Sequence, residues 1–372
     1  MTEEVLRVED LKGEYRGSFG TVYAVDGVSF SIKKGDIVAI AGESGSGKST
    51  LAELLTGAPM PMLHYESGQV LVNNKKLYIP KPENKKELRN WIKAQEKLTN
   101  LTRKEVLCKI IGYVPQSSQA SLNPVKRVRG FILDVMKQRI GTKPKRRMSP
   151  KKKIIIEIED DVIKSDETQD LRAEVLNRVK DHFEKLGLEG DVINRYPHEL
   201  SGGMKQRVVI GISTLWNPLI LIADEPTSAL DVTTQKLLIE TFMHLRELGI
   251  VETIVYISHD IPTLAQLCNR CIIMYAGKLV EINTMENIIH SPLHPYTEGL
   301  VHSIASFNPD GSAETDLAAI PGRPPNLRDP PIGCRFYDRC KKRMDICKEE
   351  SPPFFIQNGD DGSKVACWLY KK

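Results

Sequence analysis

The sequence predicts an α/β fold, in which helices cover the faces of a central β-sheet. Three short apolar runs carry this prediction, at residues 37–41, 219–223 and 253–257. Each run has the length of a strand and is apolar on both faces, which is typical of central strands in a sheet covered by helices. Stretches of helical composition separate the runs, so strands and helices alternate along the chain.

The composition is that of an ordinary globular protein. The chain has 372 residues, of which 27% are charged and 41% are hydrophobic. Its 52 Lys and Arg against 48 Asp and Glu give a formal net charge of +4. The length allows two or three domains with large cores. The near balance of charge excludes a disordered chain and a nucleic-acid binder that acts through bulk basicity.

The sequence shows no segment of the kind that targets or anchors a protein to a membrane. Its first ten residues are acidic and lack the apolar run of a signal peptide. The longest apolar stretch, residues 208–223, is interrupted by Ser213, Thr214, Asn217 and Pro218, and we therefore expect no membrane span there. These features predict a protein of the cytosol.

Two further local patterns predict secondary structure. Residues 271–275 are an apolar run, and the segment through Gly277 and then residues 279–281 predicts a β-hairpin that turns at Gly277. Residues 85–110 and 171–186 have helical composition and few helix breakers. We expect both helical stretches to lie in a helical subdomain inserted between strands of the α/β domain.

Charged blocks and a change of composition mark the domain organisation. Seven of the eleven residues 143–153 are Lys or Arg, and seven of the residues 157–170 are acidic. We interpret the stretch 143–170 as a solvated insertion or flexible loop, and an element that contacts a partner or an anionic surface is the alternative. Proline and cysteine become frequent toward the end of the chain, which predicts a main domain over 1–290 and a loop-rich, Cys-containing appendage over 291–372.

The run directly after the first predicted strand matches the phosphate-binding pattern G-x-x-x-x-G-K-[ST]. The residues are Gly42, Glu43, Ser44, Gly45, Ser46, Gly47, Lys48, Ser49 and Thr50. Glycines let backbone N–H groups turn toward phosphate oxygens, and the helix that follows points its positive N-terminus at them. Lys48 would reach the β- and γ-phosphates, and Ser49 would hold Mg²⁺. The run predicts a nucleotide site, and a Gly-rich turn with a chance Lys and Ser is the alternative.

The 219–223 strand ends in the acidic pair Asp224-Glu225. In open α/β sheets, ligands bind at the carboxyl ends of the parallel strands. We expect Asp224 to support Mg²⁺ through its hydration shell and Glu225 to polarise the attacking water, because phosphoryl transfer depends on a positioned nucleophile. An acidic pair that merely ends a hydrophobic strand is the alternative.

A second anion-binding segment precedes that strand. Ser201, 23 positions before Asp224, is followed by Gly202 and Gly203 and opens a helix that continues through residues 208–215. A serine N-cap followed by glycines presents a hydroxyl, two backbone N–H groups and a helix dipole to an anion. The chain therefore has a second phosphate-binding segment in addition to its P-loop.

Together these motifs resemble those of the ATP-binding cassette (ABC) ATPases, over about residues 5–290. Residues 200–206 match the family's LSGGQ signature, with Met204 where glutamine is common. The resemblance implies ATP hydrolysis and a P-loop NTPase fold. That fold has a RecA-like lobe, an antiparallel β subdomain and a helical subdomain inserted at about residues 117–215.

The resemblance also assigns roles to residues outside the P-loop. Gln116 resembles the Q-loop glutamine that senses Mg²⁺ and the γ-phosphate, and His259 resembles the switch histidine that contacts the γ-phosphate. Asp231 resembles the aspartate of the D-loop. In this family an aromatic residue stacks on adenine, for which we choose Tyr15 and keep Tyr23 as the alternative.

In this family each ATP lies between the P-loop of one cassette and the signature segment of another. Ser201, Gly202, Gly203 and Asp231 would therefore act in trans on the ATP of a partner. The chain has one P-loop and one signature segment, so it would dimerise with itself or with a homologous cassette. Soluble nucleic-acid or regulatory ABC ATPases form the rival class, but they usually carry tandem cassettes or long coiled coils. A transporter subunit is favoured.

Several segments are similar to the oligopeptide/dipeptide importer ATPases and extend the resemblance to about residue 367. They are residues 119–124, 201–207, 230–233, 294–297 and 331–334. The resemblance implies ATP-driven import of peptides, nickel chelates or oligosaccharides at the cytoplasmic face of the cell membrane. The implied partners are two permeases that dock near residues 116–124, an extracellular substrate-binding protein and commonly a second, nonidentical ATPase. No nucleic acid is expected.

Four of the seven cysteines lie in the appendage: Cys334, Cys340, Cys347 and Cys367. A cytosolic location disfavours disulfides. The intervals of five, six and nineteen residues disfavour zinc, which usually has a ligand pair spaced by about two to four residues. Four thiolates suffice for a [4Fe–4S] cluster, and the pattern is similar to that in peptide-importer ATPases that carry one. We predict a structural cluster, with disulfides, zinc or free thiols as alternatives.

Cys268 and Cys271 form a C-x-x-C pair, a spacing that also occurs in metal and redox sites. They lie between a predicted helix and the apolar 271–275 strand. We therefore interpret them as core residues.

Overall fold

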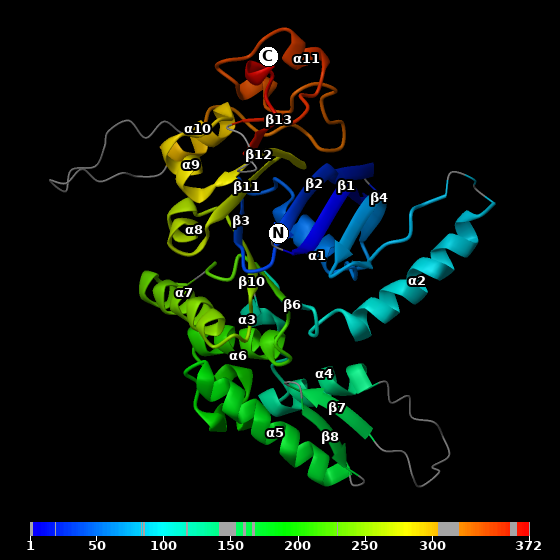
Figure 1. The fold of residues 1–372 in the computed structure, drawn as a ribbon, viewed down its shortest axis with the longest axis vertical. Helices are drawn as coiled ribbons and strands as arrows, with labels where there is room; N and C mark the ends of the chain where they lie inside the picture. Colours follow the sequence, from blue (N-terminus) through cyan, green and yellow to red (C-terminus); the bar gives the residue numbers. More distant parts are fainter. Residues whose placement is uncertain are drawn as a thin grey trace, which may run out of the picture. The chain divides into compact units, whose positions relative to one another are not determined.

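The computed structural model places most of the chain in defined elements (Figure 1). It describes residues 3–18, 20–82, 84, 86–116, 118–140, 154–158, 161–165, 168–228, 230–303, 320–357 and 363–371. The chain forms two compact units. The first consists of Met1–Thr99 and Val255–Lys372, and the second of Asn100–Ile254. The second unit is therefore inserted into the first along the sequence.

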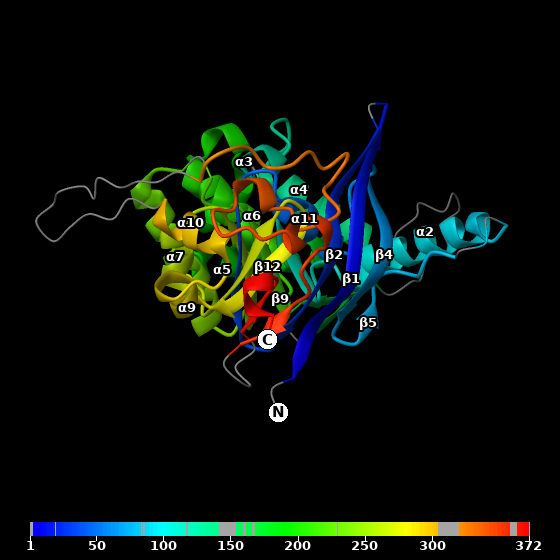
Figure 2. The same cartoon turned by 90° about the horizontal axis from the view of Figure 1, so that it is seen from above.

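The first unit contains a four-stranded antiparallel sheet in the order β2-β1-β4-β5 (Figure 2). Its strands are β1 (Glu4–Gly17), β2 (Gly20–Lys33), β4 (Leu63–Val72) and β5 (Lys75–Lys76). β1 pairs with β2 along nearly its whole length, with several register shifts that bend the sheet. Leu6, Val8 and Leu11 of β1 are buried and contribute to the core. This sheet is the antiparallel β subdomain that the resemblance implied.

A second sheet of this unit runs in the order β13-β14-β12-β11-β3-β10. Its strands are β3 (Ile37–Ala41), β10 (Thr253–Ser258, in this unit from Val255 onward), β11 (Arg270–Tyr275), β12 (Lys278–Thr284), β13 (Phe355–Ile356) and β14 (Lys364–Val365). Every residue of β3 and β10 is buried, because these strands are apolar on both faces. β11 and β12 form the predicted hairpin around Gly277. The strand predictions at 37–41 and 253–257 are therefore confirmed.

Short helices pack on this second sheet, and α8 contacts β3 while α9 contacts β11 and β12. The helices of this unit are α1 (Lys48–Leu55), α8 (Ile261–Leu267), α9 (Met285–His290) and α10 (Pro295–His302). The described part of the appendage adds η3 (Tyr337–Arg339), α11 (Ile346–Glu349) and η5 (Trp368–Tyr370) to β13 and β14. Val365 of β14 pairs with Glu281 of β12, so the appendage adds strands to the edge of the second sheet.

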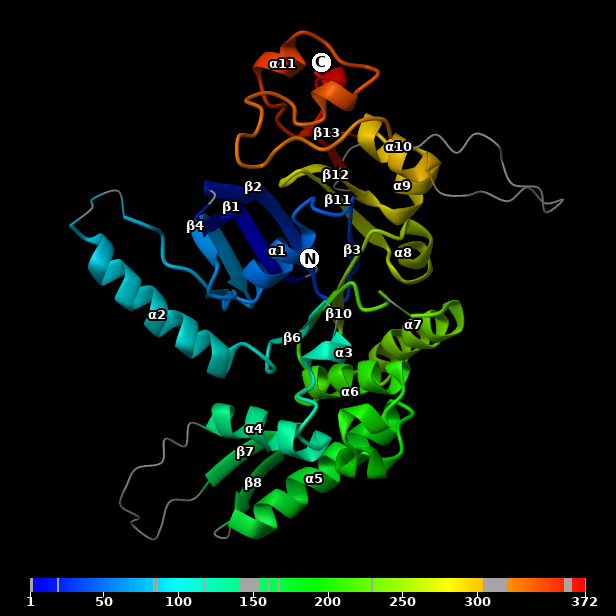
Figure 3. The ribbon, with the colours of Figure 1, turned by 180° about the vertical axis from the view of Figure 1, so that it is seen from behind.

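The second unit is mainly helical (Figure 3). Its elements are β6 (Ile111–Val114), α3 (Ser118–Ser121), α4 (Val128–Ile140), β7 (Ile154–Ile158), β8 (Asp161–Ser165), α5 (Thr168–Lys185), η1 (Gly190–Asn194), η2 (Pro197–Glu199), α6 (Gly202–Thr214), β9 (Ile220–Asp224) and α7 (Val232–Glu247). β6 and the fully buried β9 pair in parallel, which confirms the strand predicted near 219–223. No helix of the described ranges combines the length and apolar character that crossing a membrane requires.

The helices α5 and α6 pack closely in this unit. A Cβ on Gly211 of α6 would lie 2.7 Å from the ring of Phe183, so only glycine allows the helices to approach this far. His182 is buried in the same layer, with its Nε2 3.0 Å from Thr214 Oγ1. Burial lowers the pKa of His182 to about 4. The predicted helix at 171–186 is α5.

The β7–β8 pair in the charged stretch was not predicted. The two strands are antiparallel, with Ile156 opposite Ile163. β7 contacts α4 and β8 contacts α5 (Figure 3). β-Branched residues at 154–156 and 162–163 favour strands. Residues 141–153, which hold the basic block, lie outside the described residues, so the interpretation of 143–170 as a solvated insertion stays a prediction.

The helix predicted at 85–110 is α2 (Leu88–Glu105), but its surroundings differ from the expectation. Its residues up to Thr99 belong to the first unit rather than to an inserted helical subdomain. Trp91 Nε1 donates to the carbonyl O of Ile79 at 2.9 Å, and Gln95 Oε1 accepts from the N–H of Ile79 at 2.9 Å. Trp91 and Gln95 share one helix face, because they are four residues apart. This face satisfies the backbone of the segment after β5.

Candidate nucleotide site

The P-loop connects β3 to α1 in the first unit, and backbone atoms pack tightly around it. A Cβ on Gly42 would lie 2.1 Å from the carbonyl O of Met274, and one on Gly47 would lie 2.2 Å from the carbonyl O of Ala24. Gly47 also has a φ of 102° and is the N-cap residue of α1. Side chains are excluded at both positions, so the loop keeps the tight conformation that phosphate binding requires.

Lys48 is buried in this loop. Its Nζ donates to the carbonyl O of Gly42 at 2.8 Å and to that of Glu43 at 2.9 Å. The Oγ of Ser46 is also buried and has no hydrogen-bond partner among the described residues. A buried ammonium and an orphaned buried hydroxyl in a Gly-rich loop fit a phosphate group. On binding a nucleotide, Lys48 would exchange its carbonyl acceptors for phosphate oxygens.

Two tyrosines were candidates for stacking on adenine. The hydroxyl of Tyr15 lies 3.3 Å from Thr50 Oγ1, at the start of α1. Tyr23 is 41% exposed, and its N–H donates to the carbonyl O of Leu327 at 3.0 Å in the appendage. The structure therefore brings Tyr15 next to the predicted nucleotide-binding residues. Its stacking on adenine stays a prediction.

His259 lies in the first unit, between β10 and α8. Ser258 Oγ accepts from the N–H of Asp260 at 3.0 Å, and Asp260 accepts from Thr263 Oγ1 at 2.5 Å. These bonds fix the turn that presents His259, which is exposed. The histidine thus stands at the carboxyl end of a buried strand, where ligands bind in α/β sheets.

In the second unit, the acidic pair ends β9. Asp224 is buried, and Glu225 has a φ of 43°. This left-handed conformation costs about 1–3 kcal/mol in a residue other than glycine, and such strain gathers at functional sites. Glu225 Oε2 accepts from Gln116 Nε2 at 3.1 Å. The structure therefore brings together two of the residues predicted to act at the γ-phosphate.

The signature segment forms the N-terminus of α6, with Gly202 and Gly203 in its first turn. Ser201 Oγ accepts from the main-chain N–H three residues on at 3.2 Å, which confirms the predicted N-cap. Asp231 caps α7 in the same way, because it accepts from Thr234 N at 2.9 Å and from Thr234 Oγ1 at 2.7 Å. These bonds lower the pKa of Asp231.

A pocket of about 320 Å³ is shared by the N-termini of α6 and α7. Its lining is Ser201, Gly202, Gly203, Arg207, Leu230, Asp231, Thr234, Leu237 and Leu238. All four residues predicted to act on a partner's ATP are part of it. Buried Gln206 donates to the carbonyl O of Pro226, which ties α6 to the loop after Glu225.

The four appendage cysteines lie near one another. The N–H of Cys334 donates to the carbonyl O of Cys347 at 2.7 Å. Burial, followed by the proximity of other thiols of the set, raises the pKa of Cys334 to about 12 and that of Cys367 to about 11. In the part of the chain that is described, no group of three or more His, Cys, Asp or Glu side chains is arranged to hold a metal ion. The donor set suits a four-thiolate group, but this conformation does not present a finished site.

Cys268 and Cys271 are core residues, as predicted. Both are buried, and burial raises the pKa of each thiol. A neutral buried thiol behaves as a small hydrophobic group and is chemically inert.

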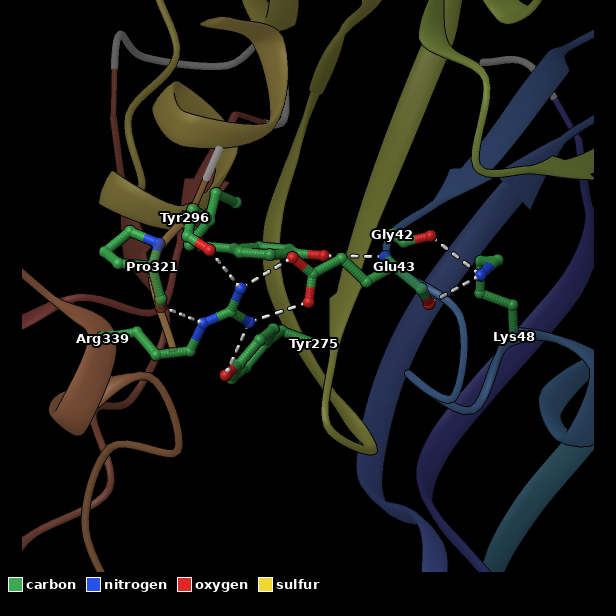
Figure 4. A network of polar contacts seen from close by, with 8 residues as sticks. Gly42, Glu43, Lys48, Tyr275, Tyr296, Pro321 and Arg339 are labelled. Carbon is green, nitrogen blue, oxygen red and sulfur yellow. Dashed lines mark hydrogen bonds and ion pairs between the residues drawn. The ribbon is translucent and has the colours of Figure 1, made fainter. Parts of the chain in front are cut away.

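Two residues that contact the P-loop were missed by sequence analysis (Figure 4). The hydroxyl of Tyr296 in α10 accepts from the N–H of Glu43 at 2.8 Å. Arg339 in η3 pairs with the carboxylate of Glu43, with Nη1–Oε2 at 2.7 Å and Nη2–Oε1 at 2.9 Å. This pairing raises the pKa of Arg339. Tyr296 and Arg339 follow Glu43 by 253 and 296 residues, so no local pattern points to them.

An α/β fold with a P-loop after β3 and a strained acidic pair after β9 defines a nucleotide-hydrolysing ATPase. Comparison with known families is more specific. The family described as "ABC transporter" matches residues 25–228, and the one described as "Oligopeptide/dipeptide transporter, C-terminal region" matches residues 280–347. The chain belongs to the ABC transporter family, and it is an ATPase.

Two curated relatives cover nearly the whole chain. The dipeptide transport ATP-binding protein DppD of Caldanaerobacter subterraneus subsp. tengcongensis is 36% identical over 369 residues, which are 99% of this chain and 98% of that protein. The oligopeptide transport ATP-binding protein OppD of Bacillus subtilis is 35% identical over 366 residues, 98% of this chain and 88% of that protein. Among solved structures, the dimeric bacterial ABC transporter cassette MJ0796 is 25% identical with a TM-score of 0.52, covering 75% of this chain and 98% of that one. The predicted family and fold class are confirmed.

Proposed function

We propose that this ATPase powers the import of oligopeptides or dipeptides through an ABC transporter, with oligosaccharides as the alternative cargo. One observation carries the proposal. A single cassette is joined, through the pair of Glu43 with Arg339, to a C-terminal region of the oligopeptide/dipeptide transporter type. Relatives that align over nearly the whole chain are named peptide transport ATP-binding proteins, which supports the choice of cargo.

The proposed assembly has two membrane permeases, an extracellular substrate-binding protein and a second, nonidentical ATPase. The chain would act at the cytoplasmic face of the membrane, bound to the permeases. The sequence contains one P-loop and one signature segment, so a site made from both across two cassettes requires a second polypeptide. The net charge of +4 over 372 residues is too small to favour nucleic-acid binding, so the proposed assembly contains no nucleic acid.

Different residues of this chain would bind the phosphates, the adenine and the Mg²⁺ ion of the nucleotide. The P-loop N–H groups and Lys48 would hold the β- and γ-phosphates, while Tyr15 would stack on adenine. Ser49, Asp224 and Gln116 would hold Mg²⁺ and its water ligands. When bound, Mg²⁺ supplies positive charge that offsets the charge on the phosphate oxygens.

Glu225 would orient the attacking water and accept its proton. The hydrogen bond from Gln116 holds one carboxylate oxygen of Glu225, and the backbone φ of 43° sets the direction of its Cα–Cβ bond. A carboxylate held in this way does not need to reorganise when the water attacks. His259 would contact the γ-phosphate and thereby sense whether it is present.

The pocket at the start of α6 and α7 would receive the ATP of the partner cassette. Ser201, Gly202 and Gly203 offer a hydroxyl and backbone N–H groups at a helix N-terminus, where an anion is favoured. Asp231 already accepts two hydrogen bonds from Thr234, so its carboxylate is held in place at the rim. Two such half-sites would close over two nucleotides.

We also propose that Cys334, Cys340, Cys347 and Cys367 hold a structural [4Fe–4S] cluster. Their proximity supports a common ligand, because four nearby thiols can lose their protons together to one metal cluster. When bound, the cluster would cross-link the short elements η3, α11 and η5. The test is iron and acid-labile sulfide per chain in anaerobically purified protein. Stoichiometric zinc without iron, or two disulfides in protein never exposed to air, would contradict the proposal.

The function is tested by reconstituting the ATPase with its permeases in vesicles together with the substrate-binding protein. We expect labelled dipeptides or oligopeptides to enter in an ATP-dependent way and to stimulate ATP hydrolysis. Oligosaccharides provide the matched alternative cargo in the same vesicles. Uptake of neither class, with ATP hydrolysis unaffected by both, would contradict the proposed function.

A further inference from the structure

The appendage reaches the P-loop through one fully bonded arginine (Figure 4). Arg339 is buried, and its guanidinium carries five N–H donors in a planar fork. Nη1 donates to Glu43 Oε2 at 2.7 Å and to Tyr275 Oη at 3.2 Å. Nη2 donates to Glu43 Oε1 at 2.9 Å and to the carbonyl O of Ile320 at 3.2 Å, and Nε donates to that of Pro321 at 2.9 Å. All five donors are therefore satisfied.

Glu43 is bonded through its main chain as well as its side chain. Its N–H donates to the hydroxyl of Tyr296 at 2.8 Å, and its carbonyl O accepts from Lys48 Nζ at 2.9 Å. Its carboxylate makes the two-point pair with Arg339. Glu43 therefore accepts a hydrogen bond from Lys48 and is also held by Arg339 of the appendage.

The pair has the geometry of a strong interaction. Two parallel charge-assisted hydrogen bonds are stronger and more directional than a single bond. The side chains of Arg339 and Glu43 are 5% and 26% exposed, so solvent screens their attraction only weakly. Without Arg339, the Glu43 carboxylate would lose its cation and would be drawn toward water. The main chain of Glu43, which bears the Lys48 acceptor, would move with it.

We propose that Arg339 is a positioning residue of the ATP site. Through Glu43 it holds the P-loop in its phosphate-binding conformation, so the nucleotide affinity of the cassette depends on the folded appendage. Arg339 acts through Glu43 rather than on the nucleotide. This role requires neither a metal centre at the cysteines nor a particular cargo.

The test measures binding of a fluorescent ATP analogue, with Mg²⁺, to the purified full-length chain. Arg339→Lys keeps the positive charge but cannot form the two-point pair or supply five donors. We expect the dissociation constant to rise about tenfold, within the usual range for coupling between two sites. Lys342→Gln is the matched control, since Lys342 lies in the same appendage and pairs with Glu298 of α10 at 2.7 Å on the surface. Its dissociation constant should stay unchanged.

A double-mutant cycle tests whether Arg339 acts through Glu43. Glu43→Gln should weaken binding of the ATP analogue to a similar degree. The dissociation constant of the double variant should be no higher than that of the single variant that binds the analogue less tightly. Losses that multiply in the double variant would mean that the two residues act independently, which would overturn the proposal. An Arg339→Lys chain that binds the analogue as tightly as the parent would overturn it too.

Limited proteolysis of the same proteins separates positioning from a general loss of the appendage fold. Glu43→Gln leaves the bonds from Arg339 to Tyr275, Ile320 and Pro321 in place. We therefore expect this variant to lose affinity while its appendage stays as resistant to protease as in the parent. Affinity that falls only in variants with a protease-sensitive appendage would show that Arg339 is merely structural.

Discussion

The two phosphate-binding segments of the chain are held in place in opposite ways. In the signature segment, Ser201 accepts from an N–H three residues on, and Asp231, which lines the same pocket from the start of α7, likewise accepts from the N–H of Thr234 three residues on. In the P-loop, Glu43 is held by Tyr296 and Arg339, which follow it by 253 and 296 residues. The start of the first segment is therefore held by a local cap, whereas Glu43 of the second is also held by the far end of the chain.

This difference determines which structural changes elsewhere in the molecule affect each segment. A helix start held by its own capping residues is insensitive to changes elsewhere in the fold. A loop held by distant side chains changes whenever those side chains lose their support. We therefore expect the nucleotide affinity of the P-loop to follow the state of the appendage, and the pocket at α6 and α7 to be independent of it.

Glu225→Gln should have the largest effect, because it removes the carboxylate that orients water and leaves the Lys48 contacts intact. Turnover should fall by about 10²–10⁴-fold, the usual contribution of a general base, while ATP still binds. The measurement is steady-state hydrolysis and nucleotide binding in the assembled transporter, with the catalytic glutamate of the partner ATPase also replaced. Near-normal hydrolysis would contradict the role of Glu225.

Ser201→Arg should disturb the signature segment and leave the P-loop of the same chain unaffected. A bulky cation at this position fills the pocket that would receive a partner's ATP, so the partner's P-loop site should lose ATP while the site at Lys48 of the same chain keeps it. Photolabelling resolved by subunit measures this. Ser201→Ala is the milder variant, because it removes the hydroxyl and about 1 kcal/mol of helix capping without filling the pocket, so the partner's site should keep more label than with Ser201→Arg. Loss of label on the mutated chain itself would refute the in-trans role.

Acid should destabilise both units through one buried histidine in each. Burial lowers the pKa of His182 to about 4 and that of His294 to about 3. Because the unfolded pKa is about 6.5, the unfolded chain binds more protons as the pH falls below that value, so stability is lost from there toward pH 4.

For His182 the complete loss would be about 3 kcal/mol in the free energy of unfolding. Urea unfolding of the parent and of His182→Gln, between about pH 7 and pH 4.5, measures it. We expect a shallower pH dependence in the variant. Parallel curves for the two proteins would show that His182 does not titrate in this way.

Tyr296→Phe should have the smallest effect, because it removes only the acceptor of the Glu43 N–H and leaves the pair with Arg339. We expect the affinity for ATP to fall about threefold, as for one neutral hydrogen bond. Tyr370→Phe is the matched control, since its hydroxyl donates to the carbonyl O of Leu293 at 2.9 Å, away from the P-loop. Equal losses in the two variants would contradict a specific role for Tyr296.

Features that depend on a few neighbouring residues were predicted from the sequence. The P-loop, the Ser201 N-cap and the hairpin at Gly277 are examples, because glycine content, a capping hydroxyl and a turn residue determine them locally. The fully buried strands β3 and β10 were predicted because a strand-length run that is apolar on both faces is typical of a sheet covered by helices.

Features that join distant parts of the chain were not predicted. The pair of Glu43 and Arg339, the addition of β14 to β12 and the bonding of Trp91 to Ile79 all arise from tertiary packing. Neither residue of such a pair carries a local sign of its partner. The appendage cysteines are an intermediate case, since their number indicated a shared ligand but their spacing left its chemistry a prediction.

The separation of 296 residues between Glu43 and Arg339 also has a consequence for translation. A ribosome releases the N-terminus first, at about 5–20 residues per second, so the P-loop emerges roughly 15–60 s before the arginine that holds it. During this interval the nascent chain has its phosphate-binding loop without the restraint on Glu43. We therefore expect full affinity for ATP to be acquired only after the appendage has been synthesised.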